Sequence, residues 1–251
     1  MWSSALLYLS VVASLIGIFF GFLYYVERLR KHWPLWKQGA AALLGLVILV
    51  AIPVVIFRDK VLVDESDLIT LREIADAANK TGDYDAAVKL TTWAVQFKPD
   101  DEELYRTRAR AYKHKGPQFY PDEIADRQLV LRLNPTRELN HLPIVEDYIL
   151  LKKYESARKW IGDYRNSIKS HDERMMFDFF EIVCDVLEAR NSTTRADEFT
   201  TSVRNRPLSK KFVNNTWEWN YLDSFLDQNP FPATSKQTIK DLVIFLKSTA
   251  T

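Results

Sequence analysis

The pattern of apolar and polar positions divides the chain into two regions near residue 60. Two long apolar runs precede that point, residues 5–26 and 38–57, and neither contains a charged side chain. As helices they would be about 30 to 33 Å long at ~1.5 Å per residue, which matches a hydrocarbon core of roughly 30 Å. We therefore expect residues 1–60 to form a two-helix transmembrane hairpin.

Beyond residue 60 the apolar positions recur with the three- and four-residue spacing of amphipathic helices. The first segment holds two apolar groups separated by a Gly-Asp turn: Leu68, Leu71, Ile74, Ala75 and Ala78, then Ala87, Leu90, Ala94 and Phe97. Pro99 ends the second group, because proline disfavours helix at the residue before it. The pattern predicts a helix–turn–helix unit of about 34 residues, a period typical of repeat proteins.

Small and aromatic residues occupy particular places within this unit. They are, in order, Leu71, Ile74, Ala75, Gly82, Tyr84, Ala87, Ala94 and Pro99. In this order they resemble the signature of the tetratricopeptide repeat (TPR) family. A second unit begins at Glu102 and matches at Tyr105, Ala109, Tyr112 and Gly116; a third begins at Glu138 and matches at Ile144, Val145, Tyr148, Tyr154 and Ala157. The resemblance implies repeats at about 68–101, 102–137 and 138–171.

The predicted fold class is all-α. A transmembrane hairpin in residues 1–60 is followed by an α-solenoid in residues 61–251, with about three TPR-like helix pairs and C-terminal capping helices in 172–251. One such pair cannot bury its apolar face alone, whereas stacked pairs share a continuous core. We expect the solenoid to be a structural unit for that reason.

The resemblance also implies a ligand groove, because the first helix of each TPR unit lines one. The charged groove residues would be Arg72, Asp76, Arg106, Arg110, Lys113 and Glu146, with Leu142 and Ile149 beside them. Arg106, Arg110 and Lys113 share one helix face, since they are three to four residues apart. We expect them to receive an acidic segment of a protein partner; the alternative is a solvated charged face.

Two further features have more than one interpretation. Trp217, Trp219 and Tyr221 alternate along the chain, and they either seal the end of the solenoid or form a binding hot spot. In the first apolar run, Ala13, Gly17 and Gly21 recur every four residues, a spacing that lets another membrane helix approach closely. That partner is either the second run or another protein.

Charge refines the membrane prediction. Residues 1–60 carry six Lys/Arg and two Asp/Glu. Residues 61–251 therefore carry 28 of the 34 Lys/Arg in the chain and 31 of its 33 Asp/Glu. Four of the six lie in the loop between the runs: Arg28, Arg30, Lys31 and Lys37. Positive loops favour the cytoplasmic side. We therefore expect an integral membrane protein with two spans and a soluble domain on the non-cytoplasmic side, in the periplasm or an equivalent compartment.

Signatures of catalysis are missing from the sequence. It has no glycine-rich phosphate loop, no closely spaced histidine pair and no basic excess of the kind that nucleic-acid binding requires. Cys184 lies in an apolar helical stretch, where a core thiol is expected rather than a nucleophile. We expect no enzymatic activity, no catalytic residue, no cofactor, no metal and no nucleic-acid partner.

Two functions fit these features. The first is a membrane-anchored TPR adaptor or scaffold, a subunit of a membrane-protein complex, whose partners are other proteins and the lipid bilayer. Linking anchor and repeat would raise the effective concentration of the recruited partner at the membrane. The second is an oligomerising membrane effector or pore, with the TPR domain as its sensor or assembly platform.

Overall fold

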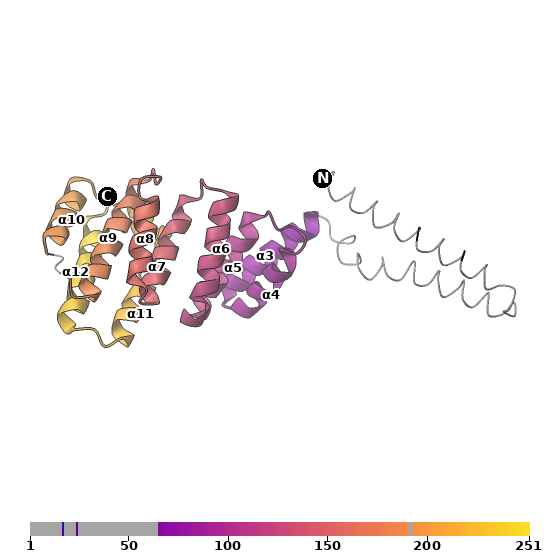
Figure 1. The fold of residues 1–251 in the computed structure, drawn as a ribbon, viewed down its shortest axis with the longest axis horizontal. Helices are drawn as coiled ribbons and strands as arrows, with labels where there is room; N and C mark the ends of the chain where they lie inside the picture. The colour runs from indigo at the N-terminus through magenta and orange to yellow at the C-terminus, as the bar shows by residue number, and fades with distance from the viewer. Residues whose placement is uncertain (1–16, 18–23, 25–64, 191–192) are drawn as a thin grey trace. The chain divides into compact units, whose positions relative to one another are not determined.

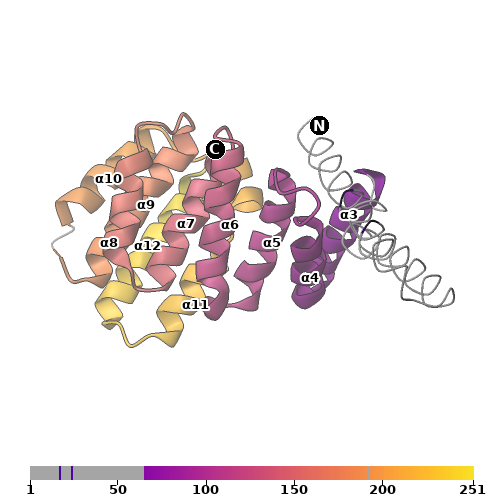
Figure 2. The same cartoon turned by 45° about the vertical axis from the view of Figure 1, so that its right-hand side comes forward.

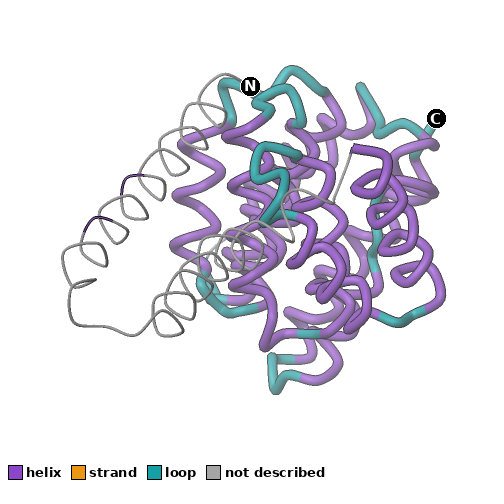
Figure 3. Tube along the Cα trace, turned by 90° about the vertical axis from the view of Figure 1, so that its right-hand side faces the viewer, coloured by secondary structure: helices purple, strands orange, loops and turns teal. Residues whose placement is uncertain are grey.

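The computed structural model describes Gly17, Tyr24 and residues 65–190 and 193–251. The chain divides into two compact units, Met1–Leu68 and Ile69–Thr251, and most of the described residues belong to the second. The described residues are helical with intervening turns and contain no strand (Figure 3). The expectation of an all-α fold is confirmed for this part of the chain.

Most of the helices follow one another in pairs joined by short turns (Figure 1). The pairs are α3 (Glu65–Thr81) with α4 (Tyr84–Ala94), α5 (Glu102–Lys115) with α6 (Tyr120–Leu133), α7 (His141–Leu150) with α8 (Tyr154–Tyr164), and α9 (His171–Leu187) with α10 (Thr193–Asn205). Each pair packs against the next, through α4 on α5, α6 on α7, and α8 on α9. This side-by-side arrangement is solenoid-like. Its fourth pair, apart from His171, lies in residues 172–251, where capping helices were expected from the sequence.

The turn between α3 and α4 shows how local chemistry sets the helix ends. Gly82 has a φ of +84°, a backbone conformation that glycine adopts without steric cost. Asp83 then begins α4, since its side chain accepts a hydrogen bond from the amide of Ala86 at 3.1 Å. The same device starts α5, where Asp101 accepts from the amide of Glu103 at 3.0 Å.

The C-terminal helices complete the core rather than extending the row of pairs. After α10 the chain passes through a short helical segment, η4 (Phe212–Thr216), into α11 (Asn220–Gln228) and α12 (Ala233–Thr249). Helix α12 packs on α9, α10 and α11, and α11 also contacts α7 (Figure 2). Phe177, Phe179 and Phe180 of α9 are fully buried in the core that results.

The structure corrects the expected membrane localisation. None of the helices in the described ranges is long and apolar enough to cross a bilayer. The longest, α3, α9 and α12, have 17 residues each, fewer than the roughly 20 apolar residues that a span requires. The two-span integral membrane protein with a non-cytoplasmic soluble domain was therefore a wrong prediction. Residues 5–26 and 38–57, apart from Gly17 and Tyr24, lie outside the described residues.

The proposed small-residue packing motif of the first run falls largely in the same part of the chain. Ala13 and Gly21 lie outside the described residues, and Gly17 is helical and exposed. The loop residues Arg28, Arg30, Lys31 and Lys37 also lie outside them.

The small residues of α4 provide a direct test of the packing between pairs. Ala87 and Ala94 are fully buried, so a large side chain at Ala87 has no space to occupy. Ala87→Trp is expected to lower the free energy of unfolding by about 1–3 kcal/mol through overpacking. Urea denaturation of the full chain followed by circular dichroism measures this change. Lys89→Trp is the control, because Lys89 is exposed on the same helix, and equal losses for both variants would contradict tight packing at Ala87.

Candidate functional site

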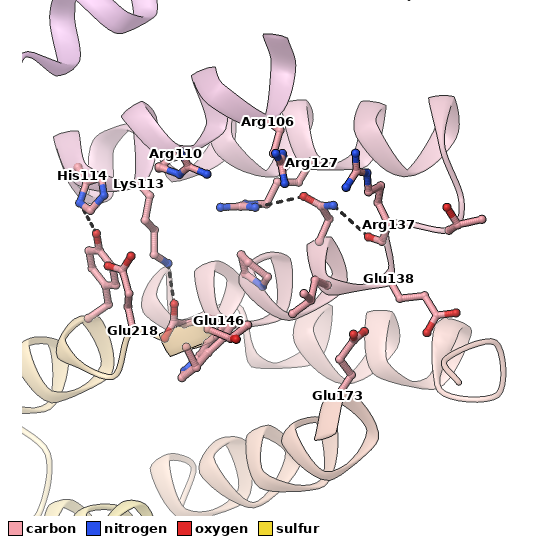
Figure 4. Close-up of a pocket in the computed structure, with 17 residues that line it drawn as sticks. Arg106, Arg110, Lys113, His114, Arg127, Arg137, Glu138, Glu146, Glu173 and Glu218 are labelled. Carbon is pink, nitrogen blue, oxygen red and sulfur yellow. Dashed lines mark hydrogen bonds and ion pairs between the residues drawn. The ribbon is translucent and has the colours of Figure 1, made fainter. Parts of the chain in front are cut away.

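A charged cavity of about 570 Å³ lies among the first helices of successive pairs (Figure 4). Its walls come from α5, α7 and α9, with contributions from α6, from the turn η3 (Glu138–Asn140) and from the segment that follows η4. The charged and titratable residues that line it are Arg106, Arg110, Lys113, His114, Arg127, Arg137, Glu138, Glu146, Glu173 and Glu218. The cavity therefore presents both signs of charge to an occupant.

At the bottom of the cavity lies a buried ion pair. The Lys113 ammonium is 2.8 Å from Glu146 and also contacts Asp147. The rings of Tyr120 and Tyr221 lie 4.8 Å from the same nitrogen, at cation–π distance. Lys113 is only 6% exposed, so this side chain is committed to the interior of the domain.

The electrostatics of this cluster follow from burial. Burial alone would lower the pKa of Lys113, but the carboxyl groups of Asp147, Glu146 and Glu123 outweigh it and raise that pKa well above its ordinary value. Burial also raises the pKa of Glu146, and raises the pKa of Asp147 well above its usual range, with Glu123 pushing in the same direction. Of the two carboxyl groups that Lys113 contacts, Asp147 is therefore the one whose neutral form burial favours more strongly.

A second buried pair lies beside the first. Arg127 contacts Glu123 with a nitrogen–oxygen distance of 2.5 Å and donates to the side-chain oxygen of Asn140 at 3.2 Å. Glu123 is fully buried and Arg127 nearly so. A proton on one of the three buried carboxyl groups would leave two carboxylates to balance Lys113 and Arg127. This balance is what makes buried charge tolerable.

The arginines at the rim of the cavity are different, because they remain partly exposed. Arg106 pairs with Glu103 at 2.5 Å and Arg110 with Asp76 at 3.4 Å, and both side chains are about two-fifths exposed. Such surface pairs contribute roughly 0–1 kcal/mol each, so a ligand carboxylate can replace the internal partner at little cost. The rim arginines are the groups best placed to receive an acidic occupant.

Among the described residues, Glu173 is the buried carboxyl group of the cavity that forms no ion pair. It lies in the first turn of α9, where the Ser170 hydroxyl accepts a hydrogen bond from its backbone amide at 3.4 Å. The side chain is 6% exposed, and its Oε2 has no hydrogen-bond partner among the described residues. Burial raises the pKa of Glu173 to about 7, and the negative charges of Glu138 and Asp172 contribute in the same direction.

The C-terminal segment closes one side of the cavity. The Tyr221 hydroxyl lies 2.5 Å from Nδ1 of His114, which links α11 to α5 across 107 positions of sequence. His114 in turn stacks on Tyr84 of α4 at a centroid distance of 4.8 Å. Trp217 and Trp219 are buried, against Phe180 and Phe179 respectively. The geometry therefore supports the interpretation that these two tryptophans seal the end of the solenoid.

The charged residues expected in a groove behave in three different ways. Arg106, Arg110, Lys113 and Glu146 all line the cavity, although Lys113 and Glu146 are buried against each other. Asp76 does not line it and instead accepts from the Thr107 hydroxyl at 3.0 Å and pairs with Arg110. Arg72 is half-buried on α3 and is not part of the wall.

The expectation that Leu142 and Ile149 would present an apolar ligand surface was wrong. Both side chains are fully buried in the core. Helix α7 is apolar on most of its surface because α6, α8, α9 and α11 all contact it. A helix covered on several sides has no free apolar face.

Several residues of the cavity were not anticipated from the sequence. They are His114, Arg127, Arg137, Glu138, Glu173 and Glu218. Glu173 lies in the first turn of α9 between Asp172 and Arg174, so the sequence around it resembles any charged helix start. His114 lies in the last turn of α5, and the others come from turns, second helices or the returning C-terminal segment. Helical periodicity does not show which of these residues face the cavity.

Cys184, the one cysteine of the sequence, does not line this cavity. Cys184 is fully buried, and burial raises the pKa of its thiol to about 12, as a core position requires. Within those ranges no group of three His, Cys, Asp or Glu side chains is arranged to hold a metal ion.

Comparisons with known proteins add no relative to this picture. No protein-family model, no curated protein and no solved structure matches the chain. The TPR resemblance therefore stays a prediction that rests on the residues quoted above.

Proposed function

We propose that the chain is an adaptor whose helical domain binds a segment of a protein partner in the charged cavity. The observation that carries this proposal is the unpartnered Glu173 carboxylate oxygen, buried in the wall of a cavity that three successive first helices line. Buried polar atoms normally have a partner, and a missing one calls for an explanation. A bound segment supplies that partner.

The shape and chemistry of the cavity support a peptide rather than a small apolar ligand. Ligand pockets for small molecules are lined predominantly by apolar and aromatic side chains with few polar groups. Here most of the lining side chains are charged or hydrogen-bonding, and the walls come from helices far apart in the sequence. An extended segment with several polar groups can satisfy such a surface at many points.

A random-peptide display library selected on the immobilised full chain tests the proposal. We expect enriched peptides whose affinity falls roughly tenfold or more for Arg106→Glu/Arg110→Glu, a loss of about 1.4 kcal/mol or more in binding free energy. The two reversals place negative charge where the rim would meet ligand carboxylates, and like charges repel.

The matched control is Lys89→Glu/Arg132→Glu. It makes the same change in net charge at two exposed positions of α4 and α6 that do not line the cavity. Circular dichroism establishes equal folding of both double variants. Enrichment of no peptide, or equal weakening by the two double variants, would refute a binding role for the cavity.

A further inference from the structure

The two signs of charge occupy different walls of the cavity. Arg106, Arg110 and Lys113 come from α5, and Arg127 comes from α6. Glu173 comes from α9, and Figure 4 shows it extending toward the cavity from the wall opposite Arg106 and Arg127. A ligand that fills the space therefore meets cations on one side and carboxylates on the other.

The carboxylates are not equivalent, because internal cations have already paired with some of them. Glu146 forms an ion pair with Lys113 at a nitrogen–oxygen distance of 2.8 Å. Glu138 accepts a hydrogen bond from the backbone amide of Lys169 at 2.9 Å. Among the described residues Glu173 forms no ion pair, and the charges that act on it from nearby, Glu138 and Asp172, are negative.

We propose that Glu173 is the anion of a subsite that receives a lysine or arginine side chain of the bound segment. This inference rests on the proposed function and names the chemistry that the cavity selects. An ammonium or guanidinium group would give the free Oε2 a charge-assisted hydrogen bond, which is among the strongest contacts available to a buried carboxylate. It would also offset the negative potential of Glu138 and Asp172.

The two arginines at the rim, Arg106 and Arg110, add a second requirement to the ligand. Arg106 and Arg110 hold their internal partners only through exposed pairs, so an acidic group of the ligand can replace those partners. The favoured segment consequently carries a basic residue for Glu173 and an acidic residue for the rim. This differs from a purely acidic ligand, which would bring a further negative charge to Glu173.

The first test compares peptides selected by the wild type and by Glu173→Gln from the same display library. We expect the wild-type peptides to share one basic position. Replacing that residue by norleucine should lower affinity for the wild type at least tenfold, and should lower affinity for Glu173→Gln less than threefold. Glu218→Gln is the control, because Glu218 is exposed in the same cavity, and it should keep the full tenfold effect.

The pH dependence of binding gives a second readout. Because burial raises the pKa of Glu173 to about 7, its carboxyl group is protonated in acid and ionised above neutral pH. Affinity of the selected peptide should rise with pH between 5.5 and 8, by up to about tenfold per pH unit below 7, and level off above it. The other titratable groups of the cavity include His114, Lys113, Glu138, Glu146, Glu218 and Tyr221, so Glu173→Gln must abolish most of the rise.

The outcomes separate the two proposals. If no enriched peptide depends on Arg106 and Arg110, the proposed function fails. If peptides depend on the rim but show no shared basic residue, or if norleucine costs the same in wild type and Glu173→Gln, the subsite fails alone. A folded Glu173→Gln is expected, because the substitution removes a buried charge, and its thermal unfolding at pH 8 checks this.

Discussion

Lys113→Met is expected to lower the free energy of unfolding by about 3–5 kcal/mol. The substitution keeps most of the volume of the lysine stem but removes the ammonium group that pairs with Glu146 at 2.8 Å. Glu146 is 2% exposed, so its charge would remain in the interior without compensation. Breaking one side of a buried pair typically costs this much, because the remaining ion has lost both water and partner. Urea denaturation at pH 7, followed by circular dichroism, measures the change.

Asp147→Asn is the matched control for this prediction. Burial already favours the neutral form of the Asp147 carboxyl group, and the amide has nearly the same size, so we expect a loss below about 1.5 kcal/mol. Adding Glu146→Gln to Lys113→Met should recover part of the stability, because it removes the stranded charge. A loss for Asp147→Asn as large as that for Lys113→Met would show that the ionised form of Asp147 also stabilises the cluster.

The helix pairs were predictable from the sequence because their signals are local. Gly82 and Asp83 mark a turn by backbone freedom and by capping, and both act within a few residues of where they stand. Ala87 and Ala94 are small because a neighbouring helix lies against them, and their spacing shows which face it covers. Turn and spacing together fixed the positions of the first pair.

The chemistry of the cavity was only partly predictable, since spacing assigns residues to a face but not to partners. Arg106, Arg110 and Lys113 do share one face of α5 and line one cavity. The sequence does not show that Lys113 meets Glu146, 33 positions away, whereas Arg110 meets only the half-exposed Asp76. That pairing makes one cation structural and leaves the other available to a ligand.

Glu173 illustrates a different limit. Its neighbours in the sequence are Asp172 and Arg174, so the local pattern reads as an ordinary charged first turn of a helix. Glu138 of the turn η3 and Trp217 of the C-terminal segment line the same cavity. Both are more than 30 positions away from Glu173, and the periodicity of α9 does not show that the three meet at one cavity.

The second large effect is expected at the aromatic closure. Trp217→Ala should lower the free energy of unfolding by about 3–5 kcal/mol, because it removes a large buried ring and leaves a void that its neighbours only partly fill. Trp217 lies edge-to-face on Phe180 at 5.7 Å between centroids and stacks on Phe212 at 6.4 Å. Both neighbours belong to the same core as Leu246 of α12. The loss should therefore destabilise the C-terminal helices together.

Trp93→Ala is the control, because Trp93 is 39% exposed and packs edge-to-face on Phe97 alone among the described aromatic rings. Its replacement removes less buried area, and we expect a loss below about 1.5 kcal/mol at roughly 25 cal/mol per Å² of apolar surface. Chemical denaturation of the full chain gives both values, and hydrogen exchange locates the opening: the amides of α11 and α12 should exchange faster in Trp217→Ala only. Equal stability of Trp217→Ala and wild type would mean that the ring is not needed to seal the domain. Its place in the cavity wall would then be better explained by contact with the bound segment.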